Sequence, residues 1–302
     1  MTPFRQVGIF SLGLMGGSLA GALHRARFAG RVVAQSGNAE SIRLGRERGW
    51  LHEGHADPAR AAQGCDLIVL CAPILNIADS LRAALPGIAP GTIVTDLGST
   101  KSWLAAELPR VLRDGGVPAT YVPAHPMCGS EKSGFEFSDP ALYENRTCAV
   151  CRDEGIPSQA VDRVTEFWQA LGSRVAHMTS AEHDRWTART SHLPHMAASL
   201  LAHTVGCGGE LEPGLLSMVG SGFTDTSRLA EGSPTVWKQI TATNHCEILA
   251  ALDAYAGRLD HLRAEIRAGA ANGDWSGVER FLAEGVQGRL RLVPPKADGH
   301  GA

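Results

Sequence analysis

The sequence lacks long apolar runs, concentrated basic charge and a recognisable leader segment. No stretch approaches the roughly 20 apolar residues of a membrane-spanning helix, so we expect no membrane span. The formal net charge is −3 and no Lys/Arg cluster occurs, which argues against a nucleic-acid partner because phosphate binding needs dense positive charge. The first residues lead directly into a predicted strand, so we expect no signal peptide.

Cysteine is present, but without the spacing of a disulfide framework. Seven cysteines in 302 residues is an odd count, typical of reduced thiols in a cytoplasmic protein. Cys148 and Cys151 have CxxC spacing, yet they fall in a predicted strand, where residues three apart face opposite sides. His192 and His195 would share a helix face, but no third ligand accompanies them. We therefore predict free thiols and no metal site.

The composition fits a globular protein with two domains. Hydrophobic residues make up 44% and charged residues 20% of the chain. Strand and helix patterns alternate to about residue 178, and helical patterns follow. We predict an α/β domain over residues 1–178, a helical domain over 179–293 and a disordered tail over 294–302.

A glycine-rich turn follows the first predicted strand, residues 7–10, and leads into a helical pattern that ends at Arg25. This is the context of a GxGxxG fingerprint, whose backbone N–H groups bind the pyrophosphate of a dinucleotide. Ser11 stands where the first glycine is usual, and the alternative is a turn without a ligand. The predicted cofactor-binding residues of this turn are Ser11, Leu12, Gly13, Leu14, Met15 and Gly16.

The residue after the second predicted strand, 31–35, bears on the choice of cofactor. A site selective for NAD normally has an acidic residue there, but this chain has Ser36. A neutral hydroxyl does not repel a 2′-phosphate, so we predict tolerance of, or preference for, NADP. No arginine follows directly, and the candidates to bind the phosphate are Arg25, Arg27 and Arg43.

The alternation continues through further predicted strands (66–71, 92–96, 121–122, 142–151 and 173–178) and helices (75–85, 103–113 and 158–171). This order predicts a doubly wound parallel sheet, whose ligands bind beyond the carboxyl ends of its strands. Ala72, Pro73 and Ser99 lie at such ends. Ser99 has a second interpretation, as the N-cap of the helix that starts near Trp103.

The segment from His125 to Gly134 concentrates reactive side chains. It contains an imidazole, two hydroxyls, a carboxylate and an ammonium group, and we expect it to leave the end of the strand at 121–122. We expect the imidazole of His125 to keep a nearly ordinary pKa, close to neutral pH. The alternative is a polar turn that contains a histidine by chance.

Helical periodicity dominates after Ser180, over residues 181–205 with a break at Pro194, over 237–266 and over 275–291. Before the second of these, a glycine-led turn ends in Arg228. Its guanidinium can hold a carboxylate through two hydrogen bonds, or it can pair with Asp225. The apolar stripe of 237–266 is long enough to require a partner helix, so we expect a homodimer.

Together these motifs resemble the prephenate/arogenate dehydrogenase family of tyrosine biosynthesis, from Val7 to about Arg291. The resemblance implies a Rossmann-type nucleotide-binding domain followed by an all-helical dimerisation domain, with NAD or NADP as cofactor. The segments that carry it are residues 13–18, 96–101, 125–134, 191–195 and 222–228.

The resemblance also implies a reaction, the oxidative decarboxylation of prephenate or arogenate. Hydride passes from C4 of a cyclohexadienyl ring to the nicotinamide, carbon dioxide leaves C1, and the ring becomes aromatic. His125 matches the family's base and Ser99 the serine that orients it and the substrate hydroxyl. Arg228 matches the arginine that binds a substrate carboxylate. His195, Ser130 and Glu131 match positions that lie on the substrate side of the pocket in this family.

Other functions fit part of the pattern. A 4-amino-4-deoxyprephenate dehydrogenase would carry an amine at C4, and a non-catalytic NADP-binding protein would not need His125 or Arg228. A β-hydroxyacid dehydrogenase normally uses a lysine on the helix between its domains, and residues 181–205 contain none. Between the two main substrates, His195 favours the pyruvyl side chain of prephenate.

Overall fold

The computed structural model describes residues 4–129, 132–207, 212 and 214–293. Contacts divide the chain into two compact units after Ile248. The first unit contains both sheets and all helices up to the first part of the longest one. The second contains the rest of that helix and one more.

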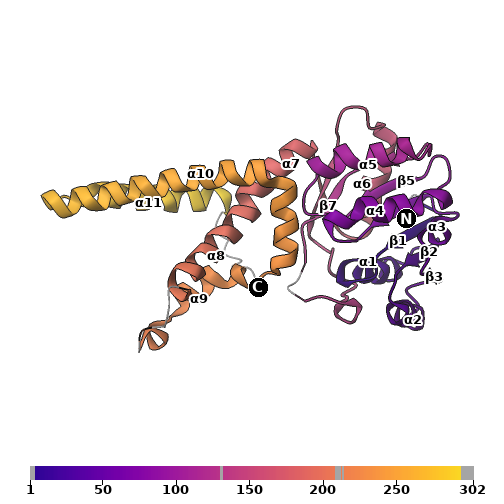
Figure 1. Cartoon of the computed structure of the whole chain (residues 1–302), viewed down its shortest axis with the longest axis horizontal. Coiled ribbons are helices and arrows are strands. Elements are labelled where there is room, and N and C mark those ends of the chain that lie inside the picture. Colours follow the sequence, from indigo (N-terminus) through magenta and orange to yellow (C-terminus); the bar gives the residue numbers. More distant parts are fainter. Residues whose placement is uncertain (1–3, 130–131, 208–211, 213, 294–302) are drawn as a thin grey trace, which may run out of the picture. The chain divides into compact units, whose positions relative to one another are not determined.

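A parallel sheet of six strands forms the centre of the first unit (Figure 1). Its order is β3-β2-β1-β4-β5-β6. The chain order reverses beside β1, and ligands of such sheets bind beyond the strand ends at that point. The strands are β1 (Gln6–Phe10), β2 (Arg31–Gln35), β3 (Glu53–His55), β4 (Leu67–Leu70), β5 (Ile93–Asp96) and β6 (Thr120–Tyr121).

Helices cover both faces of this sheet. Every residue of β4 and β5 is buried, as expected of parallel strands between two helical layers. Helices α3, α4 and α5 contact one another, and α1 shares an apolar core with β1 and β4. The predicted doubly wound fold is confirmed. The helices are α1 (Leu14–Arg25), α2 (Ala39–Glu47), α3 (Pro58–Ala62), α4 (Ile74–Ala84), the 3-10 turn η1 (Leu85–Gly87) and α5 (Ser102–Asp114).

The later predicted strands form a separate sheet. β7 (Ala124–Pro126) pairs antiparallel with β8 (Thr147–Cys151), and β9 (Arg174–Met178) pairs parallel with β8. The 3-10 turn η2 (Phe135–Phe137) precedes β8, and α6 (Ser158–Ala170) lies between β8 and β9 in the chain. The apolar stripe of α6, with Leu171 as its C-cap, is buried in the core: Val161, Val164, Phe167, Trp168 and Leu171. All seven cysteines are free thiols.

From Ser180 onward the chain is helical, as predicted. Pro194 lies in the first turn of α8, where its missing N–H has no cost, and a π-helical turn joins α7 to α8. The glycine-led turn expected before Arg228 is instead a short helix, α9, with Gly220 as its N-cap. The elements are α7 (Ser180–Thr187), η3 (Ala188–His192), α8 (Leu193–Gly206), η4 (Leu215–Met218), α9 (Ser221–Ser227), η5 (Arg228–Glu231) and α10 (Pro234–Asn272).

The second unit is a helical hairpin, made of the rest of α10 and α11 (Ser276–Leu292). Gly273, with a φ of 75°, makes the turn, and the rings of His261 and Phe281 meet edge to face with centroids 5.7 Å apart. α11 is described over its full length and buries none of its residues. Large apolar side chains of the hairpin are more than 40% exposed: Tyr255, Leu259, Ile266, Trp275, Leu282, Val286, Leu290 and Leu292.

None of the helices that the structure describes is long and apolar enough to cross a membrane. The tail predicted to be disordered, residues 294–302, lies outside the described residues.

Candidate active site

The glycine-rich turn after β1 holds a serine in a conformation that favours glycine. Ser11 has a φ of 81°, in the left-handed region where other residues are uncommon. Its N–H donates a 2.9 Å hydrogen bond to the carbonyl oxygen of Gln35, which fixes the turn against β2. Such strained residues cluster at binding sites, where the surrounding structure imposes them. Ser11 therefore takes the conformation for which the fingerprint uses glycine.

Two glycines leave the turn open to a ligand. A Cβ on Gly16 would lie 2.1 Å from the Ser11 carbonyl oxygen, so α1 can begin this close to the turn only with glycine there. A Cβ on Gly13 would meet nothing within 4 Å. Among the described residues, no side chain caps the N-terminus of α1, so its first amides are available to an anion. These residues fit the pyrophosphate of a dinucleotide.

Ser36 follows β2 and is 7% exposed. Its hydroxyl accepts a 3.1 Å hydrogen bond from the N–H of Asn38, and its own hydrogen can still be donated to a ligand. None of the three candidate arginines has a clear role beside it. Arg43 pairs with two glutamates of its own helix, and Arg25 and Arg27 lie at the far end of α1, about 18 Å along the helix.

The other predicted cofactor residues lie where expected. Ala72 and Pro73 follow β4, the neighbour of β1, and Pro73 is the N-cap of α4. Cys71, just before them, donates its N–H to the carbonyl oxygen of Phe10 at 2.8 Å. The segment after β4 is therefore held beside the glycine-rich turn.

A buried ion pair lies between the segment of Ser99 and the strand of His125. Lys101 and Asp96 are both 0% exposed, and their side chains form a salt bridge. The Nζ of Lys101 also donates a 2.7 Å hydrogen bond to the carbonyl oxygen of Ala124. Ser99, which is half-buried, lies between Asp96 and Lys101 in the chain. The network holds its loop against β7.

Ser99 is not the N-cap of the helix that follows it, so that alternative is wrong. The N-cap of α5 is Lys101, and its side chain makes no capping hydrogen bond. The carboxylate of Asp184 binds the first amides instead. The N–H of Lys101 donates to Oδ1 at 2.7 Å, and the N–H of Ser102 donates to Oδ2 at 2.8 Å.

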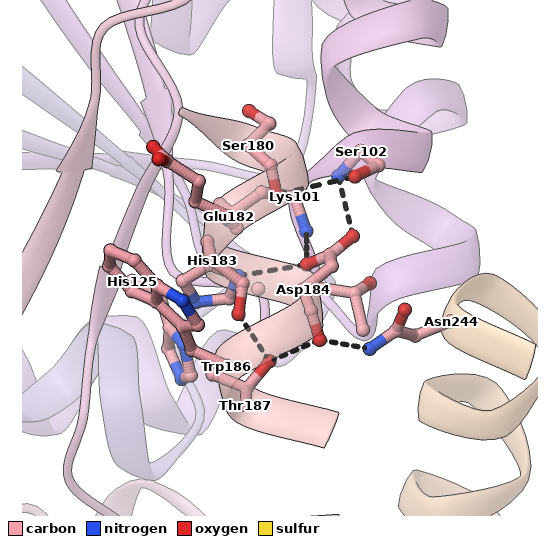
Figure 2. Close-up of polar contacts among 12 residues, drawn as sticks. Lys101, Ser102, His125, Ser180, Glu182, His183, Asp184, Trp186, Thr187 and Asn244 are labelled. Atoms are coloured by element: carbon pink, nitrogen blue, oxygen red, sulfur yellow. Dashed lines mark hydrogen bonds and ion pairs between the residues drawn. The ribbon is translucent and has the colours of Figure 1, made fainter. Parts of the chain in front are cut away.

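His125 lies within a strand, so our expectation of a loop beyond a strand end is wrong. It is the middle residue of β7 and pairs with Ala149 of β8, which fixes its backbone. The side chain is half-buried. Its Nδ1 lies 2.9 Å from Nε2 of His183, and Nδ1 of His183 lies 2.8 Å from Oδ1 of Asp184 (Figure 2).

Our sequence analysis assigned no role to His183 or Asp184. Both lie in α7, are 1% exposed and reach residues far away in the chain. The one available signal was a histidine followed by an aspartate near the start of a predicted helix, and that pair is common in solvated helices. Their role depends on contacts that periodicity cannot predict.

The surroundings of His125 lower its pKa well below 6.5. Burial is the largest cause, and His183, Lys101 and His192 act in the same direction. The nearly ordinary pKa that we expected is wrong, because the sequence does not indicate that a buried lysine lies close by. At neutral pH the ring is therefore in the uncharged form, which can accept a proton.

Asp184 is a carboxylate at neutral pH. Burial alone would raise its pKa, but hydrogen bonds from His183 and from the amides of Lys101 and Ser102 outweigh burial and lower it. Burial also lowers the pKa of His183, although the hydrogen bond to Asp184 opposes that shift. The carboxylate of Asp184 and the neutral imidazoles of His183 and His125 therefore form a hydrogen-bonded chain.

His192 and His195 pack around Trp237. His195 lies flat on the indole, with ring centroids 3.5 Å apart, and His192 meets the indole edge to face at 5.8 Å. His195 is 6% exposed. This environment is that of a packed histidine, and a contact of His195 with substrate stays a prediction. No metal-binding cluster occurs among the described residues.

Arg228 begins η5, directly before Leu229, and its side chain is exposed. It forms no ion pair with Asp225, which is likewise described. A continuous line of contacts leads from the candidate base to this turn. The line runs through His125, His183, Asp184, Asn244, His192, Trp237 and His195, and α8, which carries His195, packs against η5.

Ser130 and Glu131, predicted to line the pocket mouth, lie outside the described residues. A cavity of about 710 Å³ lies among α5, β6 and the segment from Asp153 to Pro157. Its lining contains none of the predicted site residues, although it includes Ser102 and Tyr121, which donate to Asp184 and Asp96.

Two family models match the chain in succession. Residues 19–177 match the nucleotide-binding domain of prephenate dehydrogenase, and residues 179–284 match its dimerization domain. This chain belongs to the prephenate dehydrogenase family. The resemblance inferred from the motifs is confirmed, and so is the enzyme class, an NAD(P)-dependent prephenate/arogenate dehydrogenase.

Relatives in this family resemble most of the chain. The cyclohexadienyl dehydrogenase of Zymomonas mobilis is 28% identical over 97% of both chains. The prephenate dehydrogenase of Bacillus subtilis is 27% identical, over 84% of this chain and 68% of the relative.

Solved structures of family members have the same fold. Aquifex aeolicus prephenate dehydrogenase in complex with hydroxyphenyl propionate and NAD+ has a TM-score of 0.85 and 27% identity, covering 95% of this chain and 98% of that one. Synechocystis arogenate dehydrogenase has a TM-score of 0.81 and 27% identity, covering 95% and 100%.

Proposed function

We propose that this protein catalyses the oxidative decarboxylation of prephenate, arogenate or both. The observation that carries the proposal is His125, a neutral imidazole held on a strand in the same compact unit as a turn that fits a dinucleotide. Relatives that act on prephenate and arogenate, one of them crystallised with NAD+, support it.

The proposed chemistry needs one base and one cation from the protein. The bound nicotinamide supplies a hydride acceptor. His125 takes the proton of the C4 hydroxyl while the C4–H electron pair departs as hydride. The C4–O bond becomes a carbonyl, and the C1–carboxylate bond then breaks as carbon dioxide leaves. Its electrons complete the aromatic ring and displace the carbonyl electron pair onto the C4 oxygen, and the phenolate so formed takes back the proton from His125. Ser99, after the carboxyl end of β5, would orient the hydroxyl and His125.

The substrate carries carboxylates, so its site requires a fixed positive charge. Arg228 is exposed and has no ion-pair partner among the described residues, which leaves its guanidinium available for a two-pronged bond. His195, which lies in α8 beside the turn that Arg228 begins, would contact the side chain of the substrate. Ser130 and Glu131 would line the mouth of the pocket.

We propose that the cofactor site accepts NADP as well as NAD. Ser36 carries no charge to repel a 2′-phosphate, and its hydroxyl hydrogen can be donated to an oxygen. None of the three candidate arginines is placed to bind the 2′-phosphate, so the proposed preference for NADP rests on the absence of a negative charge at Ser36.

We propose that two copies assemble through the helical hairpin. The apolar side chains that α10 and α11 leave exposed need a partner surface, and a match to a dimerization domain supports a second copy of this chain. We also place the protein in a reducing compartment, the cytoplasm, since none of its cysteines is paired.

Steady-state assays with purified protein test the proposal. Prephenate, arogenate and 4-amino-4-deoxyprephenate would each be supplied with NAD+ and with NADP+, and reduced cofactor and carbon dioxide measured together. We expect equal amounts of both products with prephenate or arogenate. Tight cofactor binding without turnover of any of the three would instead support a non-catalytic binding protein, and turnover of the amino compound alone would identify the secondary-pathway enzyme.

A further inference from the structure

The contacts of His125 decide which of its ring nitrogens carries the proton. Asp184 is ionised, and a carboxylate only accepts hydrogen bonds, so Nδ1 of His183, which faces it, must be protonated. A neutral imidazole has one N–H, and Nε2 of His183 therefore carries a lone pair. That lone pair faces Nδ1 of His125 at 2.9 Å (Figure 2). Nδ1 of His125 is then the protonated nitrogen, and its Nε2 is bare.

We infer that His183 is a positioning residue, which holds His125 in the tautomer whose Nε2 accepts the substrate proton. With the other tautomer, Nε2 would present an N–H to the substrate hydroxyl and could not remove its proton. That the substrate hydroxyl is the proton donor rests on the proposed function, whereas the tautomer of His125 follows from the contacts within the protein alone. When Nε2 gains the proton, His125 becomes an imidazolium with N–H at both nitrogens, and His183 still accepts from Nδ1.

Asp184 anchors the arrangement because both of its oxygens are committed. They accept from the amides of Lys101 and Ser102, at the positive end of α5, as well as from His183. The backbone carbonyl of Asp184 accepts from the side-chain amide of Asn244 at 2.9 Å. A carboxylate bound to three N–H groups cannot turn away, so the tautomer of His183 is fixed as well.

His183 is held from its own helix too. Its backbone carbonyl accepts a 2.8 Å hydrogen bond from the hydroxyl of Thr187, and its N–H donates to the carbonyl of Thr179 at 2.9 Å. The capping box of Thr179 and Glu182 fixes the start of α7. The ring therefore meets His125 from a rigid helix, as an orienting group must.

Two substitutions separate orientation from packing. In His183→Gln, the side-chain oxygen can reach the place of Nε2 and accept the Nδ1–H of His125. In His183→Met, a side chain of similar length fills the space but accepts no comparable hydrogen bond. The tautomer would be measured from long-range 1H–15N spectra of 15N-histidine-labelled protein with NADP+ bound, and His125 assigned by the signals lost in His125→Asn.

The inference predicts a bare Nε2 on His125 in the wild type and in His183→Gln, and a mixture of tautomers in His183→Met. We expect kcat to fall at least about tenfold in His183→Met, towards the roughly 10⁴-fold that a wrong tautomer costs in a comparable base and orienter pair. His183→Gln should recover much of that loss, and the Kd for NADP+ should stay unchanged in both.

Three outcomes would overturn the inference. One is a wild-type His125 protonated at Nε2. Another is a His183→Met enzyme with unchanged kcat, and a third is a His183→Gln enzyme as slow as His183→Met, which would indicate packing alone. If His183→Met fails to fold, the wild-type tautomer and the glutamine variant still decide. Since the tautomer is measured without substrate, a failure of the proposed reaction would leave this result intact and be recognised separately.

Discussion

Nζ of Lys101 donates a 2.7 Å hydrogen bond to the carbonyl oxygen of Ala124, the residue just before His125. Lys101 and Ala124 are both fully buried. The lysine charge is balanced by Asp96, which also accepts from the Tyr121 hydroxyl at 2.7 Å. This contact joins the loop of Ser99 to the strand of His125, so a buried polar network holds the two predicted catalytic residues in one place.

Replacing Lys101 should therefore destabilise the protein and disturb the site. Lys101→Met leaves the carboxylate of Asp96 buried without its cation, and breaking a buried pair in this way costs about 3–5 kcal/mol. Urea unfolding would measure this loss. Arg43→Met is the matched control, because it removes an exposed cation with two glutamate partners, and solvent-exposed ion pairs contribute little to stability. Equal losses in the two variants would contradict a structural role for the buried pair.

His125→Asn should remove the base while leaving cofactor binding intact. We expect kcat to fall by roughly 10²- to 10⁴-fold, the usual contribution of general base catalysis, with an unchanged Kd for NADP+. Rapid-quench or steady-state kinetics and fluorescence titration would measure the two quantities. His177→Asn, at an exposed histidine of β9, should behave as wild type. A His125→Asn enzyme with kcat near that of the wild type would show that another group takes the proton.

Arg228→Ala should weaken substrate binding. Loss of a charged, partly desolvated hydrogen-bonded pair costs about 2–5 kcal/mol, which corresponds to a rise in KM of roughly 30-fold or more. Arg228→Lys keeps the charge but loses the planar guanidinium, so its KM should lie between those of the wild type and Arg228→Ala. Arg110→Ala on the exposed side of α5 serves as control. An unchanged KM in Arg228→Ala would remove this residue from the substrate site.

Ser36→Asp should turn the cofactor preference towards NAD. A carboxylate there would repel the 2′-phosphate and accept from the ribose hydroxyls, so the ratio of kcat/KM for NADP over NAD should fall at least about tenfold. Ser36→Ala stays neutral and should change that ratio little. A wild-type enzyme that discriminates strongly against NADP would contradict our interpretation of this position.

Acid should destabilise the fold through buried histidines that resist protonation. Burial lowers the pKa of His192 to about 4, from an ordinary 6.5. In the unfolded chain His192 protonates near pH 6.5, whereas in the folded protein it resists protonation until about pH 4. The free energy of unfolding is therefore highest above pH 6.5 and decreases as the pH falls towards 4. The loss amounts to about 3 kcal/mol for this group. Desolvation also lowers the pKa values of His125 and His183.

Thermal unfolding across pH 4–7.5 would test this linkage. His192→Asn offers a non-titrating acceptor to the amide of Asn244, which lies 3.3 Å from Nδ1 of His192. The difference in unfolding free energy between wild type and variant should shift by about 3 kcal/mol in favour of the variant as the pH falls from 6.5 to 4. A constant difference over that range would show that His192 protonates as readily in the folded protein as in the unfolded one.

The alternation of elements could be predicted from local patterns alone. The strand at Arg31–Gln35 and the helix that ends at Arg25 occur where their apolar periodicity placed them. Such patterns depend on neighbours a few residues apart, so they are visible in one dimension. The motifs around Gly13, Ser99, His125 and Arg228 could be named for the same reason, since each is a short run of particular residues.

Long-range side-chain pairing was not accessible in this way. Fifty-eight residues separate His125 from His183, and 82 separate Ser102 from Asp184. Nothing in the local pattern distinguishes His183 from a solvated helix histidine, or indicates that Lys101 is wholly buried. The pKa of His125 was misjudged for that reason, because desolvation and the charge of Lys101 act only after the chain has packed.

The order of residues was thus sufficient for the kind of fold and for naming candidate groups for the chemistry, because both follow from short-range patterns. The protonation state and direction of the base emerge only in three dimensions. They depend on which hydrogen-bond donors and acceptors meet in a space without water, where an unpaired group is costly and only one arrangement of protons satisfies every partner.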